Sequence, residues 1–376
     1  MKKKYTSIIF VLSAFLGFKA FAQIDNSAFS DKITPDSAKS RTLELSVYSY
    51  NYQRNYEYFN KFADGLTWFG TQNIPSLTFY SNENVAINAG ILIRKDFGFD
   101  GINEVLPVFS IIYEKKSLKL INGVLQGTTD HNYLELLYDQ DRKIFDPLEY
   151  GTQLIVNKKY FYSDLWVNWE KMIYKPASEQ EEITGGLSGR IKPFQFNNIR
   201  LEFPVQAIAL HKGGQIDTLS APIQTRLNTA VGSEFTLTTK GFVKQVQLSV
   251  YLLNQKLFSP ANYQIFESGY GYSFNGMIRT NYFDFHTTYF KGSGFESIVG
   301  APVYESVSEQ FNNVGYSQKN RELIIFRLIG NINLSKNLIL SSRFEPYIDF
   351  KTKDQFQFSN SLFLIFNEDF FIRKIR

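Results

Sequence analysis

The chain has 376 residues, 40 of them basic and 36 acidic, and it contains no cysteine. Without cysteine, disulfides, thiolate nucleophiles, cysteine metal sites and a lipid-anchored cysteine are all excluded. The net charge of +4 comes from the first 22 residues, which hold four lysines and no acid. The rest of the chain is formally neutral, so no nucleic-acid partner is predicted.

The first residues have the layout of a secretory signal. Lys2, Lys3 and Lys4 precede an apolar run at residues 8–18, and Ala20-Phe21-Ala22 supplies small residues before a cut. The apolar run is shorter than the roughly 20 residues that a membrane helix needs. We therefore predict a cleavable signal peptide at 1–22, cut after Ala22. A polar, flexible periplasmic tail at 23–40 and a barrel at 41–376 are expected to follow.

Alternating polar and apolar residues dominate the remaining sequence. In the segment 225–237, Leu227, Val231 and Phe235 share one parity, while Arg226 and Glu234 share the other. Such segments run for roughly 10–14 residues, longer than the usual 5–6 of globular strands. A tilted transmembrane strand needs about 9–11. A soluble sandwich would also alternate, but the strand length and the polar second face favour a closed antiparallel barrel in a membrane.

We predict an all-β, up-and-down transmembrane barrel of about 16 strands, with 14 to 18 as the range because 131–139 could add a strand. The predicted strands are 43–58, 74–80, 85–95, 105–114, 117–125, 148–157, 160–172, 182–192, 198–210, 222–238, 243–253, 269–279, 281–291, 321–334, 338–350 and 355–366. Connectors after odd-numbered strands are long, except the last, and those after even-numbered strands are short. This alternation is typical of bacterial barrels, with long loops outside the cell.

The C-terminus fits this pattern less well. Many barrels end on an aromatic residue, but here Phe370 and Phe371 are followed by residues 372–376. Two interpretations remain open. Either the insertion signal is internal, or the final segment forms a short periplasmic appendage.

These features together resemble the porin-like outer-membrane β-barrel proteins of the Bacteroidota. The Lys-rich start, the Ala22-Gln23 junction, the Tyr-, Phe- and Asn-rich strands and the lack of cysteine all resemble that group. The segments 165–170 and 211–214 are similar to parts of uncharacterised members. The resemblance implies the fold and a location in the Gram-negative outer membrane, and it carries over no functional residue.

The strand number leads to the functional prediction. Barrels of 16–18 strands leave an aqueous channel. We therefore expect a porin that passes small hydrophilic solutes, not an enzyme, with no cofactor and with outer-membrane lipid and lipopolysaccharide around it. The alternative is a plugged barrel that acts as a binding or assembly subunit, holding a partner protein of the outer membrane or a surface glycan.

The connector at 126–149 mixes charged with apolar residues, which a solvated loop tip would not need. We expect it to fold inward and to present its charges as the constriction of the pore. Its candidate residues are Asp130, His131, Glu135, Asp139, Asp141, Arg142, Asp146 and Glu149. The charged residues expected to face the lumen from the strands are Arg226, Glu234, His286, Arg343 and Glu345. A loop cap or a partner-binding surface explains the connector equally well.

The three histidines, His131, His211 and His286, show no metal-ligand spacing. Asp139-Gln140-Asp141 is spaced like part of a calcium loop but lacks the glycine and terminal glutamate of that motif. For a lipid hydrolase, His286 with Ser293 is the pair that sequence alone suggests. His286 lies opposite Phe283 and Phe285 in parity and should point into the lumen, away from lipid. A hydrolase is thus the least favoured function, and no metal site is predicted.

Overall fold

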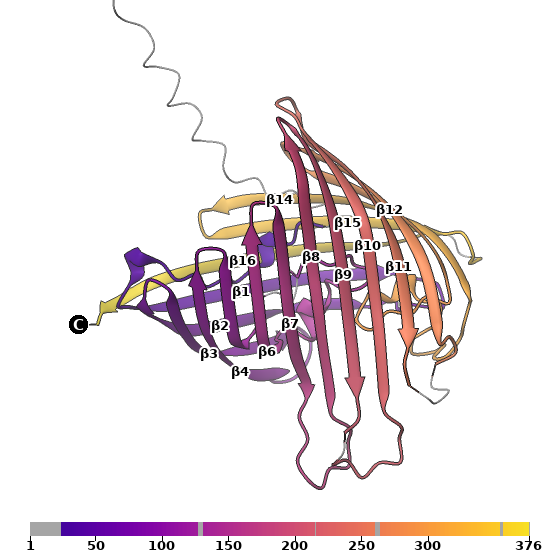
Figure 1. The fold of residues 1–376 in the computed structure, drawn as a ribbon, viewed down its shortest axis with the longest axis horizontal. Helices are drawn as coiled ribbons and strands as arrows, with labels where there is room; N and C mark the ends of the chain where they lie inside the picture. The colour runs from indigo at the N-terminus through magenta and orange to yellow at the C-terminus, as the bar shows by residue number, and fades with distance from the viewer. Residues whose placement is uncertain (1–23, 127–130, 215, 260–263, 354–355, 376) are drawn as a thin grey trace, which may run out of the picture.

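The computed structural model describes residues 24–126, 131–214, 216–259, 264–353 and 356–375, so the predicted signal peptide and its cleavage site lie outside the described residues. Within them, sixteen strands form one closed antiparallel barrel in which each strand pairs with its neighbours in the chain. Pairing between β1 and β16 closes the barrel. In Figure 1 the near strands cross the far ones steeply, as tilted barrel strands do.

The strands are β1 (Thr42–Glu57), β2 (Thr67–Asn82), β3 (Val85–Asp96), β4 (Glu104–Lys115), β5 (Leu118–Val124), β6 (Tyr150–Lys158), β7 (Phe161–Lys171), β8 (Glu182–Phe196), β9 (Ile199–Lys212), β10 (Gln224–Thr238), β11 (Val243–Leu257), β12 (Ser268–Thr280), β13 (Asp284–Ser293), β14 (Asn320–Ser335), β15 (Leu338–Asp349) and β16 (Phe356–Lys374). The helical segments are η1 (Ser27–Phe29), η2 (Ser37–Lys39), α1 (Arg142–Phe145) and η3 (Pro302–Tyr304). No helix in the described ranges is long and apolar enough to cross a membrane.

The structure confirms the predicted barrel and its sixteen strands, and it corrects several strand boundaries, most of all the start of β2 and the end of β16. β2 begins at Thr67, earlier than predicted. The prediction missed its first residues because outward positions there, such as Thr71 and Asn73, are polar and hide the alternation. β16 continues to Lys374, which pairs with Thr42 at the start of β1. The C-terminal residues thus complete the ladder that closes the barrel and form no appendage within the described residues.

The two ends of the barrel differ. The connectors after odd-numbered strands gather at one end, called here the long-loop end, and the tight turns gather at the other, the short-turn end. Side chains alternate between the lumen and the outer wall. On β1, for example, Tyr48, Tyr50 and Tyr52 are buried inside, whereas Leu45 is exposed outside.

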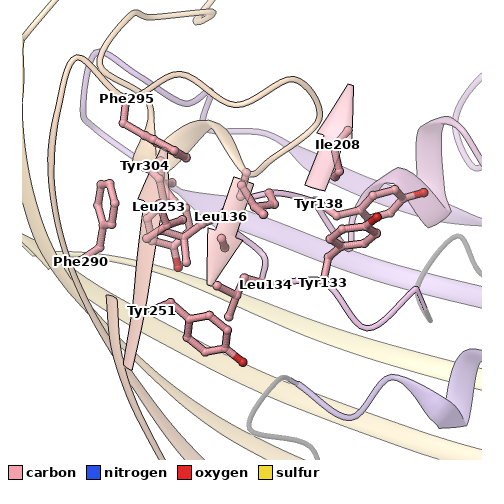
Figure 2. Packing of buried hydrophobic residues seen from close by; sticks show 14 of the residues in the cluster. Tyr133, Leu134, Leu136, Tyr138, Ile208, Tyr251, Leu253, Phe290, Phe295 and Tyr304 are labelled. Carbon is pink, nitrogen blue, oxygen red and sulfur yellow. The ribbon is translucent and has the colours of Figure 1, made fainter. Parts of the chain in front are cut away.

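Two connectors from the long-loop end fold into the lumen, and their described residues, 125–126 with 131–149 and 294–319, are together called the plug. Figure 2 shows its apolar centre. There Tyr133, Leu134, Leu136 and Tyr138 of the first connector and Phe295 and Tyr304 of the second meet Ile208, Tyr251, Leu253 and Phe290 of the wall. Burial of this apolar surface holds the plug inside the barrel.

The segment before β1 also lies in the lumen, where the sequence predicted a flexible tail. Phe29 is buried and packs edge-on against Tyr50 and Phe363. The hydroxyl of Tyr48 donates a hydrogen bond to the carbonyl oxygen of Phe29 at 2.7 Å. Arg279 on β12 also pairs with Asp25, and Arg343 on β15 donates to Asn26. The segment is thus held by residues of distant strands, and composition alone gives no sign of it.

Gly186 on β8 leaves the space in which the plug meets the wall. A Cβ there would stand 2.7 Å from the ring of Trp166 and would also clash with the hydroxyl of Tyr133. We expect Gly186→Ala to destabilise the protein by about 1–3 kcal/mol, the usual cost of overpacking. Thermal unfolding in detergent measures this. Gly189→Ala is the control, because a Cβ at Gly189 meets its nearest atom at 3.6 Å. Equal stability of the two variants would contradict the prediction.

Candidate active site

The three histidines occupy three different environments. His131 lies in the plug and is fully buried, and His286 faces the lumen from β13. His211 lies near the long-loop end of β9 and faces outward, with its side chain exposed. Because a catalytic histidine needs both a free nitrogen and access to its substrate, these environments decide which of the three can act as a base.

His131 is held by two carboxylates. Its Nδ1 lies 2.9 Å from Asp164 and its Nε2 lies 2.8 Å from Glu149, while the ring of Trp166 stacks on it at 4.7 Å between ring centroids. Burial lowers the pKa of His131, but the charges and hydrogen bonds of the two carboxylates outweigh it and raise the pKa to about 10. His131 is therefore a cation at neutral pH that ties the plug to β7, and it has no free nitrogen for catalysis.

The other charged residues predicted in connector 126–149 also have partners, except Asp130, which lies outside the described residues. Glu135 contacts Arg327 and accepts from the hydroxyl of Tyr304. The remaining pairs are Asp139 with the amide of Asp141, Asp141 with Arg54, Arg142 with Asp146 and Glu170, and Glu149 with the hydroxyl of Tyr138. The contacts with Arg327, Arg54 and Glu170 dock the plug onto the barrel wall, and the others lie within the plug.

The five charged strand residues singled out from the sequence all lie inside the barrel. Arg226 donates to the carbonyl of Ser297, Glu234 pairs with Arg190, Arg343 donates to Gln140, and Glu345 pairs with Arg54 and Arg327. His286 is 4% exposed, and its Nε2 has no hydrogen-bond partner among the described residues. The hydrogen bonds of Arg226 and Arg343 connect the wall to the plug, whereas Glu345 pairs with two arginines of the wall itself.

His286 and Ser293 do not form a site. They are seven residues apart on one extended strand, which separates them by about 23 Å. Their parities also differ, so His286 points into the lumen and Ser293 does not. The described residues also contain no group of three or more histidine, aspartate or glutamate side chains that could hold a metal.

Among the described residues, His211 differs from the other two histidines because it forms a hydrogen bond with an aliphatic hydroxyl group. Its Nδ1 lies 3.0 Å from Oγ1 of Thr225 on β10, and the two residues are direct partners in the antiparallel ladder. The amide of Thr225 donates to Oγ of Ser259 at 2.7 Å, and its carbonyl accepts from the amide of Phe258. These backbone contacts fix the hydroxyl at the end of the strand.

The outer wall beside this pair carries small side chains. Toward the short-turn end from His211, Ala209 and Ala207 face outward on β9. Gly185 on β8 pairs directly with Ala209, and Leu187 pairs with Ala207. This strip of small residues starts at His211 and lets an extended apolar molecule approach the wall closely.

A hydroxyl and an imidazole at this distance can perform nucleophilic catalysis. When Nδ1 is unprotonated it accepts the hydroxyl proton of Thr225 and makes Oγ1 a better nucleophile. Sequence reasoning missed this pair because Thr225 follows His211 by fourteen residues, across a connector. The available signal was their position at the facing ends of two consecutive predicted strands, with both residues on the apolar parity.

A family model described as lipid A 3'-O-deacylase-type matches residues 35–375. The chain belongs to this family. No curated protein sequence matches it. Among solved structures, the chain is similar to a loop L8 deletion mutant of OmpT, an outer membrane protein of Vibrio cholerae. That match has 11% identity and a TM-score of 0.51 and covers 87% of this chain and 99% of the other. OprD of Pseudomonas aeruginosa also matches at 11% identity and a TM-score of 0.51, covering 90% and 99%.

Membership of the lipid A 3'-O-deacylase-type family overturns two predictions. The prediction of a porin, or alternatively of a binding subunit, was wrong, because the family is one of hydrolases. The expectation that the chain is no enzyme was wrong for the same reason. The error has a physical cause. The width of a sixteen-stranded barrel predicts an aqueous channel only when the lumen is open, and here the plug occupies it. The solved structures support the outer-membrane barrel fold.

Proposed function

We propose that this protein is an outer-membrane hydrolase that removes an acyl chain from lipid A by cleaving its 3'-O ester. The family match over residues 35–375 carries this proposal. The barrel is placed in the outer membrane with its long-loop end outside the cell, and lipopolysaccharide is the source of the substrate. The sequence resemblance supports an origin in the Bacteroidota.

The position of His211 and Thr225 supports them as the catalytic pair. A lipid substrate lies beside the barrel, so the reacting groups must face outward, at the depth where headgroup and acyl chains join. His211 faces outward near the long-loop end, whereas His131 and His286 are buried inside. Of the three, His211 alone combines a hydroxyl partner with access from the membrane.

The roles of the pair follow from the 3.0 Å contact between Nδ1 and Oγ1. His211 takes the proton of the Thr225 hydroxyl as Oγ1 bonds to the ester carbonyl carbon. The bond between that carbon and the sugar oxygen then breaks, and His211 returns the proton to the leaving oxygen. His211 then takes a proton from a water molecule as the water oxygen attacks the acyl carbon. The bond from that carbon to Oγ1 breaks, His211 returns the proton to Oγ1, and the fatty acid is released.

The strip formed by Ala209, Ala207 and Gly185 gives the acyl chain a path along the wall. We expect Ala209→Trp to raise KM several-fold, because the large ring would fill this path while it remains compatible with a lipid-facing position. Hydrolysis rates at graded lipid A concentrations measure the effect. Ala89→Trp is the matched control, since Ala89 also faces outward but lies on β3. An unchanged KM in Ala209→Trp would show that the acyl chain does not bind along this strip.

The proposed function is tested with the purified, folded barrel. Lipid A in mixed micelles is incubated with the protein in water enriched in ¹⁸O, and both products are analysed by mass spectrometry. We expect lipid A that lacks one ester-linked acyl chain, together with an equal amount of free fatty acid that carries ¹⁸O. Intact lipid A after long incubation with folded protein would refute the proposal.

A further inference from the structure

A group of charged side chains faces outward at the long-loop end on the β13–β15 side of the barrel. Nζ of Lys291 on β13 lies 3.5 Å from Oε2 of Glu322 on β14, and Nζ of Lys351, just after β15, lies 3.4 Å from the same oxygen. The lysine side chains are 48% and 42% exposed, and that of Glu322 is 21% exposed. Two ammonium groups therefore share one carboxylate, which leaves one positive charge in excess.

Two tyrosines complete this group. The hydroxyl of Tyr289 donates to Oε1 of Glu322 at 2.9 Å, and the ring of Tyr272 lies beside that of Tyr289, with 6.4 Å between centroids. Tyrosine is the side chain that barrels place at the membrane–water boundary, with its ring in the apolar layer and its hydroxyl in the polar one. Tyr272, Tyr289, Lys291, Glu322 and Lys351 are called the rim cluster.

The surrounding wall sets the depth of the rim cluster. On β14, the outward residues that follow Glu322 are Ile324, Phe326 and Leu328, all apolar. A lysine on the lipid face is costly at the bilayer midplane but costs little near the bilayer surface. The rim cluster thus lies where the apolar wall ends, at the level of lipid headgroups.

We propose that the rim cluster binds a phosphate group carried by a membrane glycolipid, which, if the proposed function holds, is the lipid A substrate itself. A phosphate monoester carries about −1.5 to −2 charges at neutral pH and offers three acceptor oxygens. It can therefore draw both ammonium groups away from the single charge of Glu322. A membrane lipid is favoured over free phosphate because the lysines and tyrosines share the outer wall.

The rim cluster is separate from the catalytic pair. Lys291 on β13 lies three strand spacings from Thr225 on β10, which is about 14 Å around the wall. Its lysines therefore do not reach the ester that is cleaved. They hold the headgroup, and their loss is expected to raise KM while kcat is retained.

The test measures binding apart from turnover. The His211→Ala chain in detergent is titrated with lipid A, and bound lipid is counted by native mass spectrometry. Adding Lys291→Ala and Lys351→Ala is expected to weaken binding by about tenfold or more. Lys158→Ala is the control, because Lys158 faces outward at the short-turn end of β6. Lipid A stripped of phosphate is expected to bind equally to all of these variants.

A second variant separates phosphate binding from a merely structural ion pair. Glu322→Gln removes the competing carboxylate, so the rim cluster should bind phosphorylated lipid A more tightly. A purely structural cluster would lose order and bind no better. The proposal is overturned if the double lysine variant binds like the control or if Glu322→Gln weakens binding. It is also overturned if inorganic phosphate competes as well as the lipid does. Since no hydrolysis is measured, failure here leaves the proposed function standing.

Discussion

Replacing His211 with alanine is expected to lower lipid A hydrolysis by about 10²–10⁴-fold, the usual contribution of a general base. The barrel should remain folded, because the side chain faces outward and contacts Thr225 without packing in the core. Rates of fatty acid release from purified variants, each checked for folding by circular dichroism, give the measurement. His286→Ala provides the matched control, since it removes a histidine from the lumen and should keep most of the activity.

Variants of Thr225 test whether its hydroxyl is the nucleophile. Thr225→Val removes the hydroxyl at nearly constant volume and should be as inactive as the histidine variant. Thr225→Ser restores a hydroxyl and should recover activity. An active Thr225→Val variant would show that Thr225 is not the nucleophile. An active His211→Ala variant would show that the catalytic base lies elsewhere in the protein.

Replacing His131 with alanine is expected to destabilise the plug by about 3–5 kcal/mol, the cost of removing one partner from a buried ion pair. Glu149 and Asp164 would then face each other inside the barrel without the cation that separates them. Hydrogen exchange of residues 131–149 reports the loss as faster exchange. A triple variant that also carries Glu149→Gln and Asp164→Asn removes both charges and should recover much of the protection. Unchanged exchange in His131→Ala would contradict the structural role.

The same cluster gives the plug a defined pH dependence. The pKa of His131 is raised in the folded protein, from 6.5 to about 10. The stabilisation is therefore fully present below about pH 6.5 and is lost as the pH rises toward 10. Hydrogen exchange of the plug should accelerate over this range in the wild type, after correction for the intrinsic rate. His131→Gln, which does not titrate, should show no such change.

The barrel could be predicted from local sequence patterns, whereas the position of the plug depends on contacts between residues far apart in the sequence. Alternation along each strand predicted all sixteen strands, since inward and outward residues differ in polarity wherever one face is apolar. The signal weakened at the start of β2, where Thr71 and Asn73 face outward. At the C-terminus the pairing of Lys374 with Thr42 depends on a partner more than 300 residues away, which periodicity along one strand cannot show.

The candidate site was harder to predict than the fold. The apolar residues of connector 126–149 indicated from the sequence that it packs against other residues. The sequence could not show that these are wall residues of distant strands, such as Ile208 and Tyr251. His211 and Thr225 lie in separate strands, and only the register of β9 against β10 places them opposite each other. Function was mispredicted because strand number measures the width of a barrel but carries no information about what occupies it.

The most direct test of the central claim is the mass spectrum of lipid A extracted from Gram-negative cells that express this chain in their outer membrane. Cells that carry equal amounts of the His211→Ala variant are the comparison. We predict that wild-type cells contain lipid A that has lost one ester-linked acyl chain and that the variant cells retain the full set. Identical lipid A in both strains, with the wild-type barrel folded in the membrane, would contradict the assignment of this protein as a lipid A esterase.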